Sequence, residues 1–583
     1  MKVESSPPAP DGGATASRRP AESSVWEPAP VPPAAAELEA AGFSAWKAAC
    51  LARRGVADAE GAAAFLAPSV EQLSAPDALP GIAPAADRLA AAAEAGDKVA
   101  IVGDYDVDGV SATALLTAVL EACGAEVLTI LPHRMREGYG FHEAHVARAK
   151  EGGCSVLVTA DCGSSATESA AAALAAGLDL IVTDHHLSSV ELPPGVVEVN
   201  PRRAGAPPGT ESLCAAGVAF KLAEAVATRR GREISREALL RVACLGTVAD
   251  MVKLRGENRV IAAVGLAALP STPSPGLRAL MARCRLRLPL RSSDIGFRIG
   301  PRINAAGRMG EAEPALELLL TRDPLRAEQL ADELEERNRV RREAQVRVED
   351  AARERFTGLA ELPPILVAWE DGWHRGVVGI AAGRLARELH RPTILLSVEG
   401  DTASGSGRSI PGLELFDFLE PWGARLRSFG GHSQAIGMTA DLAELEDLRA
   451  EWEREASRWP AELLRRRSEY ELDLAPGELT IELARELAGL GPFGVGNPAP
   501  VAHLGPLRLC APPRRFGDGH LDLRAVDPEG VEAALLGWSW QDRQEVFEEP
   551  FEVLGVPIWD RYRDRPALRL SDARRVPRPA AGA

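Results

Sequence analysis

Long apolar runs and paired cysteines are both missing from this sequence. No uninterrupted apolar run approaches the ~18 residues that a membrane-spanning helix needs, so we expect no membrane segment. The opening stretch MKVESSPPAPDGGATASRRP has no apolar core, which argues against a secretory signal. The eight cysteines are scattered without a C-x-x-C pair, and we therefore expect reduced thiols in a cytoplasmic protein.

Positive charge is also in short supply. The formal net charge is −17 over 583 residues, which argues against a protein that coats nucleic acid by bulk electrostatics but not against one with a local basic channel. With 46% hydrophobic and 26% charged residues, the composition is that of a globular protein, and the length is enough for several domains.

Hydrophobic patterning divides the chain into regions. Pro, Ala, Ser and Gly dominate its beginning, which predicts disorder. Short β-type runs then alternate with Ala/Leu-rich helical stretches, as in a doubly wound parallel sheet, and a charged stretch without Gly or internal Pro predicts one long helix between two lobes. The predicted regions are a disordered extension (1–35), a parallel-sheet α/β domain (36–320), a connecting helix (321–357), a second α/β domain (358–460) and a small C-terminal β-domain (466–575).

Acidic residues and histidines follow three of the predicted strands, in VAIVGDYDVDG, LVTADCG and IVTDHH, and another acid ends a predicted helix in GTVADMV. Ligands of open α/β sheets bind beyond the carboxyl ends of the strands, so we expect these side chains along one rim. They are Asp104, Asp106, Asp108, Asp161, Asp184, His185, His186 and Asp250.

This combination of carboxylates and imidazoles favours a metal site. Mn²⁺ suits such ligands, with Mg²⁺ as the alternative and Zn²⁺ less favoured, and one carboxylate between two ions would make a two-metal site. Asp106 and Asp108 lie two apart at a predicted strand end, so we expect them to share a site. A single Asp after a strand is often a cap or turn residue, and for Asp184 capping or orienting a histidine is the favoured interpretation.

DYDVDG, TADCG, DHH and GTVADMV, in this order and spacing, resemble the four motifs of the DHH phosphoesterase superfamily. The resemblance extends over about residues 45 to 575 and points to the superfamily's bacterial exonuclease branch. The further motifs that carry it are PHRMREGYGF (132–141), LCAAGVAFKL (213–222), FRIGPRINAAGRMG (297–310), WHRGVVGIAAGRLA (373–386), GSGRS (405–409), GGHSQAIG (430–437) and PFGVGNPAP (492–500).

The resemblance implies a role for each motif residue. Two divalent ions would be coordinated by a set with Asp161 as the bridging ligand, which comprises Asp106, Asp108, Asp161, His185 and Asp250. Asp104 would be a further ligand or a partner of one, and His186 would face the scissile phosphate. Asn304 and Arg308 would contact the substrate near the metals.

In the second α/β domain the resemblance implies contacts to the DNA backbone and its 5′-terminal phosphate, from Ser406, Arg408, Gly431 and His432. Glycine allows backbone N–H groups to approach an anion closely, whereas a lone GSG is more often a flexible turn. Arg134 and Arg136, beside Gly138-Tyr139-Gly140, could contact the backbone, and a purely structural loop is an equal alternative.

The last domain resembles an oligonucleotide-binding (OB) β-barrel, which binds single strands through a basic groove and aromatic platforms. Candidate stacking residues are Trp538, Trp540, Trp559 and Tyr562, although most aromatic residues of small barrels belong to the core.

The implied function is a single-stranded-DNA-specific 5′→3′ exonuclease, which hydrolyses phosphodiester bonds by two-metal catalysis in recombination and repair. A phosphodiesterase or pyrophosphatase for small substrates is one alternative, disfavoured because small substrates need no third domain. A non-catalytic scaffold is the other, disfavoured by the full set of acids and His-His. The resemblance also implies that the protein is a monomer and that its partners, besides DNA, are single-strand-binding protein and a RecQ-type helicase.

Overall fold

The computed structural model describes residues 24–576, except 135, 358, 360 and 549, and the chain divides into two compact units. The first unit comprises Pro32–Asn338 together with Gly489–Ala499. The second comprises Arg339–Ala488 and Pro500–Ala583, together with the N-terminal residues up to Val31. The eight cysteines are all free, as expected, and seven of them are buried.

A five-stranded sheet forms the centre of the first unit, with the order β3-β2-β4-β5-β6 and every pairing parallel. This is a doubly wound order, in which the chain changes direction between the neighbouring strands β2 and β4. The strands are β2 (Lys98–Gly103), β3 (Glu126–Ile130), β4 (Val156–Ala160), β5 (Asp179–Thr183) and β6 (Val197–Val199).

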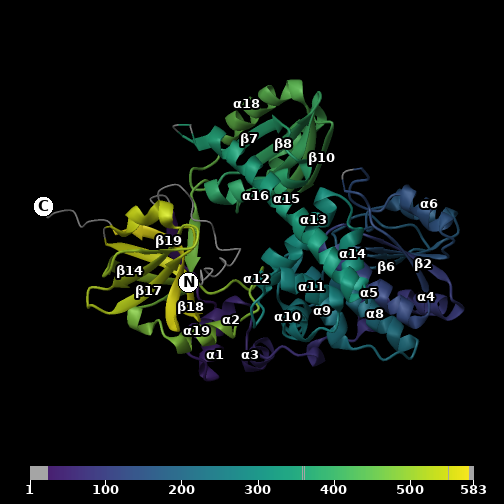
Figure 1. The fold of residues 1–583 in the computed structure, drawn as a ribbon, viewed down its shortest axis with the longest axis horizontal. Helices are drawn as coiled ribbons and strands as arrows, with labels where there is room; N and C mark the ends of the chain where they lie inside the picture. Colours follow the sequence, from purple (N-terminus) through teal and green to yellow (C-terminus); the bar gives the residue numbers. More distant parts are fainter. Residues whose placement is uncertain (1–23, 135, 358, 360, 549, 577–583) are drawn as a thin grey trace. The chain divides into compact units, whose positions relative to one another are not determined.

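Helices cover both faces of this sheet. Side chains alternate between the faces along each strand, and because apolar side chains point to both, each face has to be buried. Val99 and Ile101 of β2 belong to one apolar cluster, with α4 (Ile82–Ala95), α5 (Val107–Cys123) and α8 (Ala215–Arg229). Ala100 and Val102 belong to another, with α6 (Glu143–Glu151) and α7 (Thr167–Ala175), and Figure 1 shows α6 on the side of β2 away from α4 and α5.

The first unit contains further helices around this core. They are α1 (Ala34–Ala40), α2 (Ala45–Arg53), α3 (Ala59–Leu66), α9 (Arg236–Ala249), α10 (Gly256–Ala268), α11 (Pro275–Arg283), α12 (Ser292–Asp294), α13 (Gly300–Met309) and α14 (Glu313–Leu320). Within the described ranges, no single helix is long and apolar enough to cross a membrane, while one bent pair (Gly256–Ser271 with Pro275–Arg283) has the length and composition to do so.

One long helix, α15 (Pro324–Thr357), occupies the charged stretch for which a connecting helix was expected. It belongs to the first unit up to Asn338 and to the second from Arg339 onward. In the second unit a five-stranded sheet has the order β10-β11-β9-β8-β7, in which only β7 and β8 are parallel. Its strands are β7 (Leu366–Asp371), β8 (Thr393–Glu399), β9 (Thr402–Arg408), β10 (Ser428–His432) and β11 (Ala435–Asp441).

The two faces of this sheet are also covered by helices. One face packs against α17 (Leu415–Leu419) and α18 (Leu445–Ala456), whose Trp452 is fully buried in the shared apolar cluster. The other face carries α16 (Arg375–Leu389), and Figure 1 shows α16 and α18 on opposite sides of the green strands. This second α/β arrangement is the one that the sequence predicts.

The C-terminal part of the second unit is a closed five-stranded barrel. β14 pairs with both β16 and β18, and the ring continues from β16 through β17 and β19 back to β18, with β17 and β19 parallel. This pairing scheme is that of the OB fold, which confirms the prediction. The strands are β14 (Ala502–Leu509), β16 (His520–Val526), β17 (Glu532–Gly537), β18 (Phe551–Asp560) and β19 (Arg565–Arg575), accompanied by β13 (Leu472–Asp473), β15 (Arg514–Phe516) and α19 (Ile481–Ala488).

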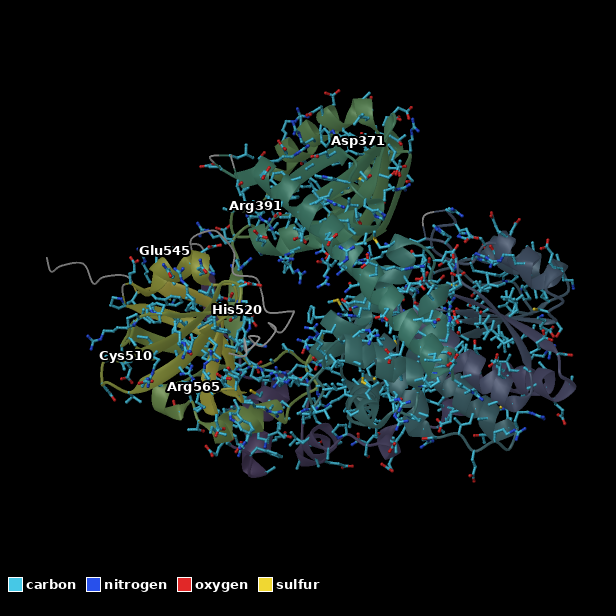
Figure 2. The ribbon with its side chains drawn as sticks, viewed as in Figure 1. Asp371, Arg391, Cys510, His520, Glu545 and Arg565 are labelled. Atoms are coloured by element: carbon cyan, nitrogen blue, oxygen red, sulfur yellow. The ribbon has the colours of Figure 1, made fainter. Side chains whose placement is uncertain are left out.

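The barrel narrows the choice among the predicted stacking residues. Figure 2 labels His520, Arg565 and the exposed Cys510 on it. Trp540 is 1% exposed and packs against Phe547 in the core, so it is excluded from the candidate base platforms. Large aromatic rings fill small barrels from inside, and the sequence pattern does not distinguish an inward ring from an outward one.

The predicted N-terminal disorder is wrong for residues 24–35, and residues 1–23 lie outside the described ranges. Val25–Pro28 form β1, which pairs in parallel with β12 (Arg467–Tyr470). Trp26 is buried, its indole Nε1 donates to Asp572 Oδ2 (3.0 Å), and the Arg574 guanidinium lies 4.2 Å from its ring centroid. This docking depends on residues more than 400 positions away, which local composition does not reveal.

Replacing Phe220 by alanine should destabilise the first unit. This side chain is fully buried on α8, so the Phe220→Ala variant should lose about 3–5 kcal/mol of unfolding free energy, as expected for a large cavity. Denaturant titration followed by circular dichroism measures the loss. Leu325→Ala, at a position that is 76% exposed, serves as the control and should change stability by less than about 0.5 kcal/mol. Equal effects of the two substitutions would contradict the assignment of Phe220 to the core.

Candidate metal centre

The carboxyl ends of β2, β4 and β5 lie side by side in the first unit. Ala160 at the end of β4 pairs with Gly103 of β2 and with Thr183 of β5, so the three following residues share one edge. These residues are Asp104, Asp161 and Asp184. The strand order makes this edge the switch point at which ligands bind, as the sequence predicts.

Asp106 forms the N-cap of α5. Its Oδ1 accepts hydrogen bonds from the backbone N–H groups of Asp108 (2.8 Å) and Gly109 (3.1 Å). A Cβ at Gly109 would lie 2.6 Å from the backbone nitrogen and the Cβ of Asp104, so a glycine is needed where the helix turns past that acid. The local sequence DYDVDG thus folds the three acids around the start of one helix.

Asp108 is buried in the first turn of α5 and is held by a second helix. Its Oδ2 accepts from the N–H of Ala215 (2.7 Å) and its Oδ1 from that of Ala216 (2.9 Å), the first two residues of α8. The positive end of the α8 dipole therefore stabilises this carboxylate. A Cβ at Gly246 of α9 would overlap Asp108 Oδ1, which explains the glycine in GTVADMV.

The expectation that Asp106 and Asp108 share a site is wrong in its geometric premise. β2 ends at Gly103 and the helix begins at Val107, so side chains two apart do not point to the same side. The ligand atoms of Asp106 lie within 4.8 Å of those of Asp104 and Asp161, whereas those of Asp108 lie with His185 and Asp250.

His185 lies among three carboxylates. Its Nε2 is 3.2 Å from Asp161 Oδ1, 3.7 Å from Asp250 Oδ2 and 3.8 Å from Asp108 Oδ2. Asp161 itself has a left-handed backbone (φ 73°), a strained conformation for a non-glycine residue that tends to occur at functional sites. Its N–H donates to Thr183 O (3.1 Å), which fixes the turn that presents the carboxylate.

Several polar atoms at this centre are buried without a hydrogen-bond partner in the described part of the chain. They are Asp104 Oδ1, Asp161 Oδ1 and both ring nitrogens of His185. Leaving such atoms unsatisfied is costly, and one ligand atom from each of these residues lies within 4.8 Å of those of its neighbours, which fits a bound cation. Carboxylate oxygens with one imidazole are the ligands that suit Mn²⁺ and Mg²⁺.

The proton affinities of the centre reflect crowded negative charge. Burial and the neighbouring aspartates raise the pKa of Asp104 and of Asp161 well above the ordinary value. Burial first, then Asp108 and Asp106, raise the pKa of Asp250 to about 8, and burial with Asp106 raises that of Asp108 to about 6. Burial lowers the pKa of His185 to about 4, so its imidazole is neutral and available as a ligand.

Asp184 orients the second histidine, as the sequence analysis favours. Its Oδ1 lies 2.7 Å from His186 Nδ1 and accepts the N–H of His185 (2.7 Å), while its Oδ2 accepts the N–H of Ser164 (3.0 Å). These contacts offset the cost of burial and hold the pKa of Asp184 below its ordinary value, while Asp184 raises that of His186. His186 therefore keeps a proton to higher pH than a free histidine does.

Asn304 and Arg308, the predicted substrate contacts of this unit, both lie on α13. Asn304 Oδ1 accepts the N–H of Val107 (3.1 Å), so this side chain also satisfies the start of α5. A Cβ at Gly307 would lie 2.8 Å from Tyr105 O, and α13 thus packs directly on the acidic loop. The structure brings this helix to the metal centre, as its predicted role requires.

The predicted phosphate-binding residues of the second unit lie on β9 and β10, the two strands on either side of β11. Ala435 of β11 pairs with both Arg408 of β9 and His432 of β10, which places these two residues at one level of the sheet. Ser406 Oγ accepts from Arg408 Nη1 (2.7 Å) and donates to Ile436 O (2.8 Å). Gly431 precedes His432 with a left-handed backbone (φ 138°).

Two contacts of the centre escape sequence reasoning. The N–H groups of Ala215 and Ala216 hold Asp108, but backbone groups leave no mark in the sequence beyond the small residues of CAAG. The Tyr139 hydroxyl donates to Asp161 O (3.1 Å) and lies 3.1 Å from His186 Nδ1. The GYG sequence predicts a loop but does not reveal this contact. The one available signal was a tyrosine placed between two glycines.

Sequence models of three families match the chain. They are the DHH family N-terminal domain (residues 98–247), the DHHA1 domain (362–458) and the RecJ OB domain (470–571). The three matches fall on the parallel-sheet domain, the second α/β domain and the closed barrel.

Curated relatives and solved structures agree with these matches. The single-stranded-DNA-specific exonuclease RecJ of Dickeya dadantii is 35% identical over 487 residues, covering 79% of this chain and 83% of that protein. That of Bacillus subtilis is 36% identical over 462 residues, and the chain spans only 58% of its length. The crystal structure of Thermus thermophilus RecJ with Mn²⁺ has a TM-score of 0.81 at 30% identity, covering 95% of this chain and 80% of that one. The chain therefore belongs to the RecJ family of single-stranded-DNA-specific exonucleases.

Proposed function

We propose that this chain is a single-stranded-DNA-specific 5′→3′ exonuclease that hydrolyses phosphodiester bonds with two divalent metal ions and releases 5′-mononucleotides. The observation that carries the proposal is the buried group of carboxylates and one neutral imidazole whose unpartnered atoms converge. Membership of the RecJ family supplies the substrate class. Solved relatives in complex with Mn²⁺ and with Mg²⁺ support the choice of metals, with Mn²⁺ favoured.

Three overlapping groups of possible ligands make up the centre. One of them is Asp161, His185 and His186, and we assign the two ions to the other two groups. Asp104, Asp106 and Asp161 form one set. Asp108, His185 and Asp250 form the other, and Asp161 Oδ1 lies 3.2 Å from His185 Nε2, so we assign the bridging role to Asp161. When bound, two such ions lower the pKa of water and neutralise charge on phosphoryl oxygens.

His186 acts beside the ligands rather than as one of them. Asp184 fixes its ring and raises its pKa, so it presents a protonated edge to an anionic phosphate oxygen. The Tyr139 hydroxyl lies 3.1 Å from the same ring nitrogen and further restrains the ring. We assign Asn304 and Arg308 to substrate contact, since α13 packs on the loop that carries Asp104 and Asp106.

We assign Ser406, Arg408, Gly431 and His432 to the backbone and the 5′-terminal phosphate of the DNA. The planar guanidinium of Arg408 suits bidentate phosphate recognition, and Ser406 holds it in place. On the barrel, Tyr562 is 65% exposed, and the guanidinium groups of Arg485 and Arg561 lie over the Trp559 ring, which favours these aromatics for base stacking. We further propose a cytoplasmic monomer that acts with single-strand-binding protein and a RecQ-type helicase.

Digestion of oligonucleotides labelled at one end or the other tests the substrate and the polarity. With Mn²⁺, 5′-labelled single strands should release labelled mononucleotide at once, while 3′-labelled strands shorten progressively and duplex stays intact. Dinucleotides serve as the control for a small-substrate enzyme. Cleavage of dinucleotides alone would contradict the exonuclease proposal.

Asp161→Ala should reduce turnover by about 10³-fold or more, because it removes the carboxylate assigned to both ions. Binding of labelled single-stranded DNA should change little, since Asp161 is not among the proposed DNA contacts. Asp332→Ala is the matched control: this residue pairs with Arg283 at the surface, and its loss should leave turnover unchanged. Full activity of the Asp161 variant would refute the two-metal assignment.

Stability and metal affinity should depend on pH in opposite directions. Because the pKa of Asp250 is raised to about 8 in the folded chain, the metal-free protein binds more protons than the unfolded chain, and its Tm should fall from pH 6 to pH 8. Mn²⁺ must displace these protons, so the rise in Tm on adding Mn²⁺ should grow over the same range. Differential scanning fluorimetry measures both, and Asp250→Asn should weaken both trends. A metal-induced shift that is larger at pH 6 than at pH 8 would contradict the assignment.

A further inference from the structure

The motif PFGVGNPAP belongs to a segment that leaves its own unit. Gly489–Ala499 lie in the first unit, whereas the chain on both sides, including α19 and β14, belongs to the second. We call this segment the strap. A Pro- and Gly-containing linker between domains ordinarily stays exposed and makes few specific contacts, so the contacts of the strap call for an explanation.

Three arginines of the first unit hold the strap. Arg54 at the end of α2 donates from Nε to Asn497 Oδ1 (2.7 Å) and from Nη2 to Pro498 O (2.6 Å). Arg255 donates to the carbonyl of Gly496 (2.8 Å) and Arg259 to that of Gly491 (2.7 Å). Arg54 and Arg259 are 4% and 3% exposed, and burying a guanidinium is costly unless its donors are satisfied.

Asn497 shapes the strap from within. It is fully buried, and its Nδ2 donates to the carbonyls of Leu490 (2.9 Å) and Pro492 (2.8 Å) while its Oδ1 accepts from Arg54. Gly494 and Asn497 also exchange backbone hydrogen bonds (2.9 and 3.1 Å). The strap is therefore a fixed loop with its own internal bonds.

The surface that the strap contacts is the loop carrying a predicted metal ligand. Residues 250–255 join α9 to α10 and begin at Asp250, the C-cap of α9. Leu254 N–H donates to Val495 O (2.8 Å). A Cβ at Gly494 would lie 2.7 Å from Leu254 Cδ1, and one at Gly496 would lie 3.0 Å from Lys253 Cβ, so the strap backbone packs directly on this loop.

Two further features of this loop bear on the position of Asp250. Met251 has a left-handed backbone (φ 59°) and is 68% exposed. The carbonyl of Lys253 accepts a hydrogen bond from Asn258 Nδ2 (3.2 Å). Asp250 Oδ2 stands 3.7 Å from His185 Nε2, and a shift of the loop would change that distance. Contacts that orient metal ligands typically change metal affinity by 10–100-fold when they are removed.

We infer that the strap is a positioning element for the Asp250 carboxylate and thereby sets the affinity of the metal centre for divalent ions. This inference rests on the proposed metal-dependent function. It also gives PFGVGNPAP a role, since the proposed substrate contacts do not include this motif. The segment that precedes the barrel in the chain would hold a metal ligand of the first unit in place.

Gly494→Ala in the full-length chain tests the inference, because the added methyl group pushes on Leu254 and on no assigned ligand. Titration calorimetry with Mn²⁺ should show affinity weakened by about tenfold. Gly296→Ala is the matched control: a Cβ there meets no atom within 4 Å, and the affinity should stay at the wild-type value. On a Leu254→Ala background, which removes the clashing atoms, Gly494→Ala should have no further effect.

Asn497→Ala provides a second approach if the methyl group is absorbed by a small shift. It removes the Arg54 contact and both internal donations, and should also weaken Mn²⁺ binding. A strap that only stabilised the fold would lower Tm and leave the Mn²⁺ affinity of the folded protein unchanged. Wild-type affinity in both variants, with circular dichroism showing them folded, would overturn the inference.

Digestion of single-stranded DNA by the same wild-type preparation separates the two proposals. An active wild type with unaffected strap variants refutes the strap and leaves the exonuclease standing. A wild type that binds Mn²⁺ but degrades no DNA refutes the exonuclease, and the affinity comparison still decides the strap. A wild type that binds no Mn²⁺ refutes both.

Discussion

Mutual repulsion among buried carboxylates is the constraint on which the rest of this structure depends. Asp104, Asp108 and Asp161 are each at most 4% exposed, and burial and neighbouring charge raise their pKa values. Among the ion pairs of the described residues, Asp108 and Asp161 pair with histidine and not with lysine or arginine. Backbone N–H groups at the starts of α5 and α8 supply partial positive charge, and bound divalent cations would supply the rest.

Close packing around the acids accounts for the small residues of the motifs. Gly109 admits Asp104, Gly246 admits Asp108, and Gly307 lets α13 lie on Tyr105, each because a Cβ would meet an atom closer than packed atoms approach. These glycines belong to three different helices. These glycines are therefore required for close packing at the site rather than for flexibility. This explains why the motifs contain small residues next to the acids.

The two units of the chain carry different candidate sites. The first holds the metal centre, and the second holds Arg408, His432 and the closed barrel. The strap is flanked in sequence by residues of the second unit, but it packs in the first unit. There Arg54 donates to Asn497 of the strap. The buried Arg54 guanidinium holds the strap through bonds to a backbone oxygen and an amide oxygen. This contact needs no additional carboxylate.

The sequence alone determined the α/β alternation, the long helix, a small C-terminal β-domain and the identity of the acids and histidines, because these follow from local periodicity and from motifs of adjacent residues. That the β-domain is an OB fold came from its resemblance to a known family. Tertiary structure alone decided that Asp106 and Asp108 fall in different ligand sets, that Trp540 is core, that Trp26 docks beside Asp572, and that Asn497 meets Arg54. Apart from Trp540, which packs against the nearby Phe547, each of these depends on where a helix begins or on partners hundreds of residues apart. Packing between distant segments leaves no periodic signal in either segment.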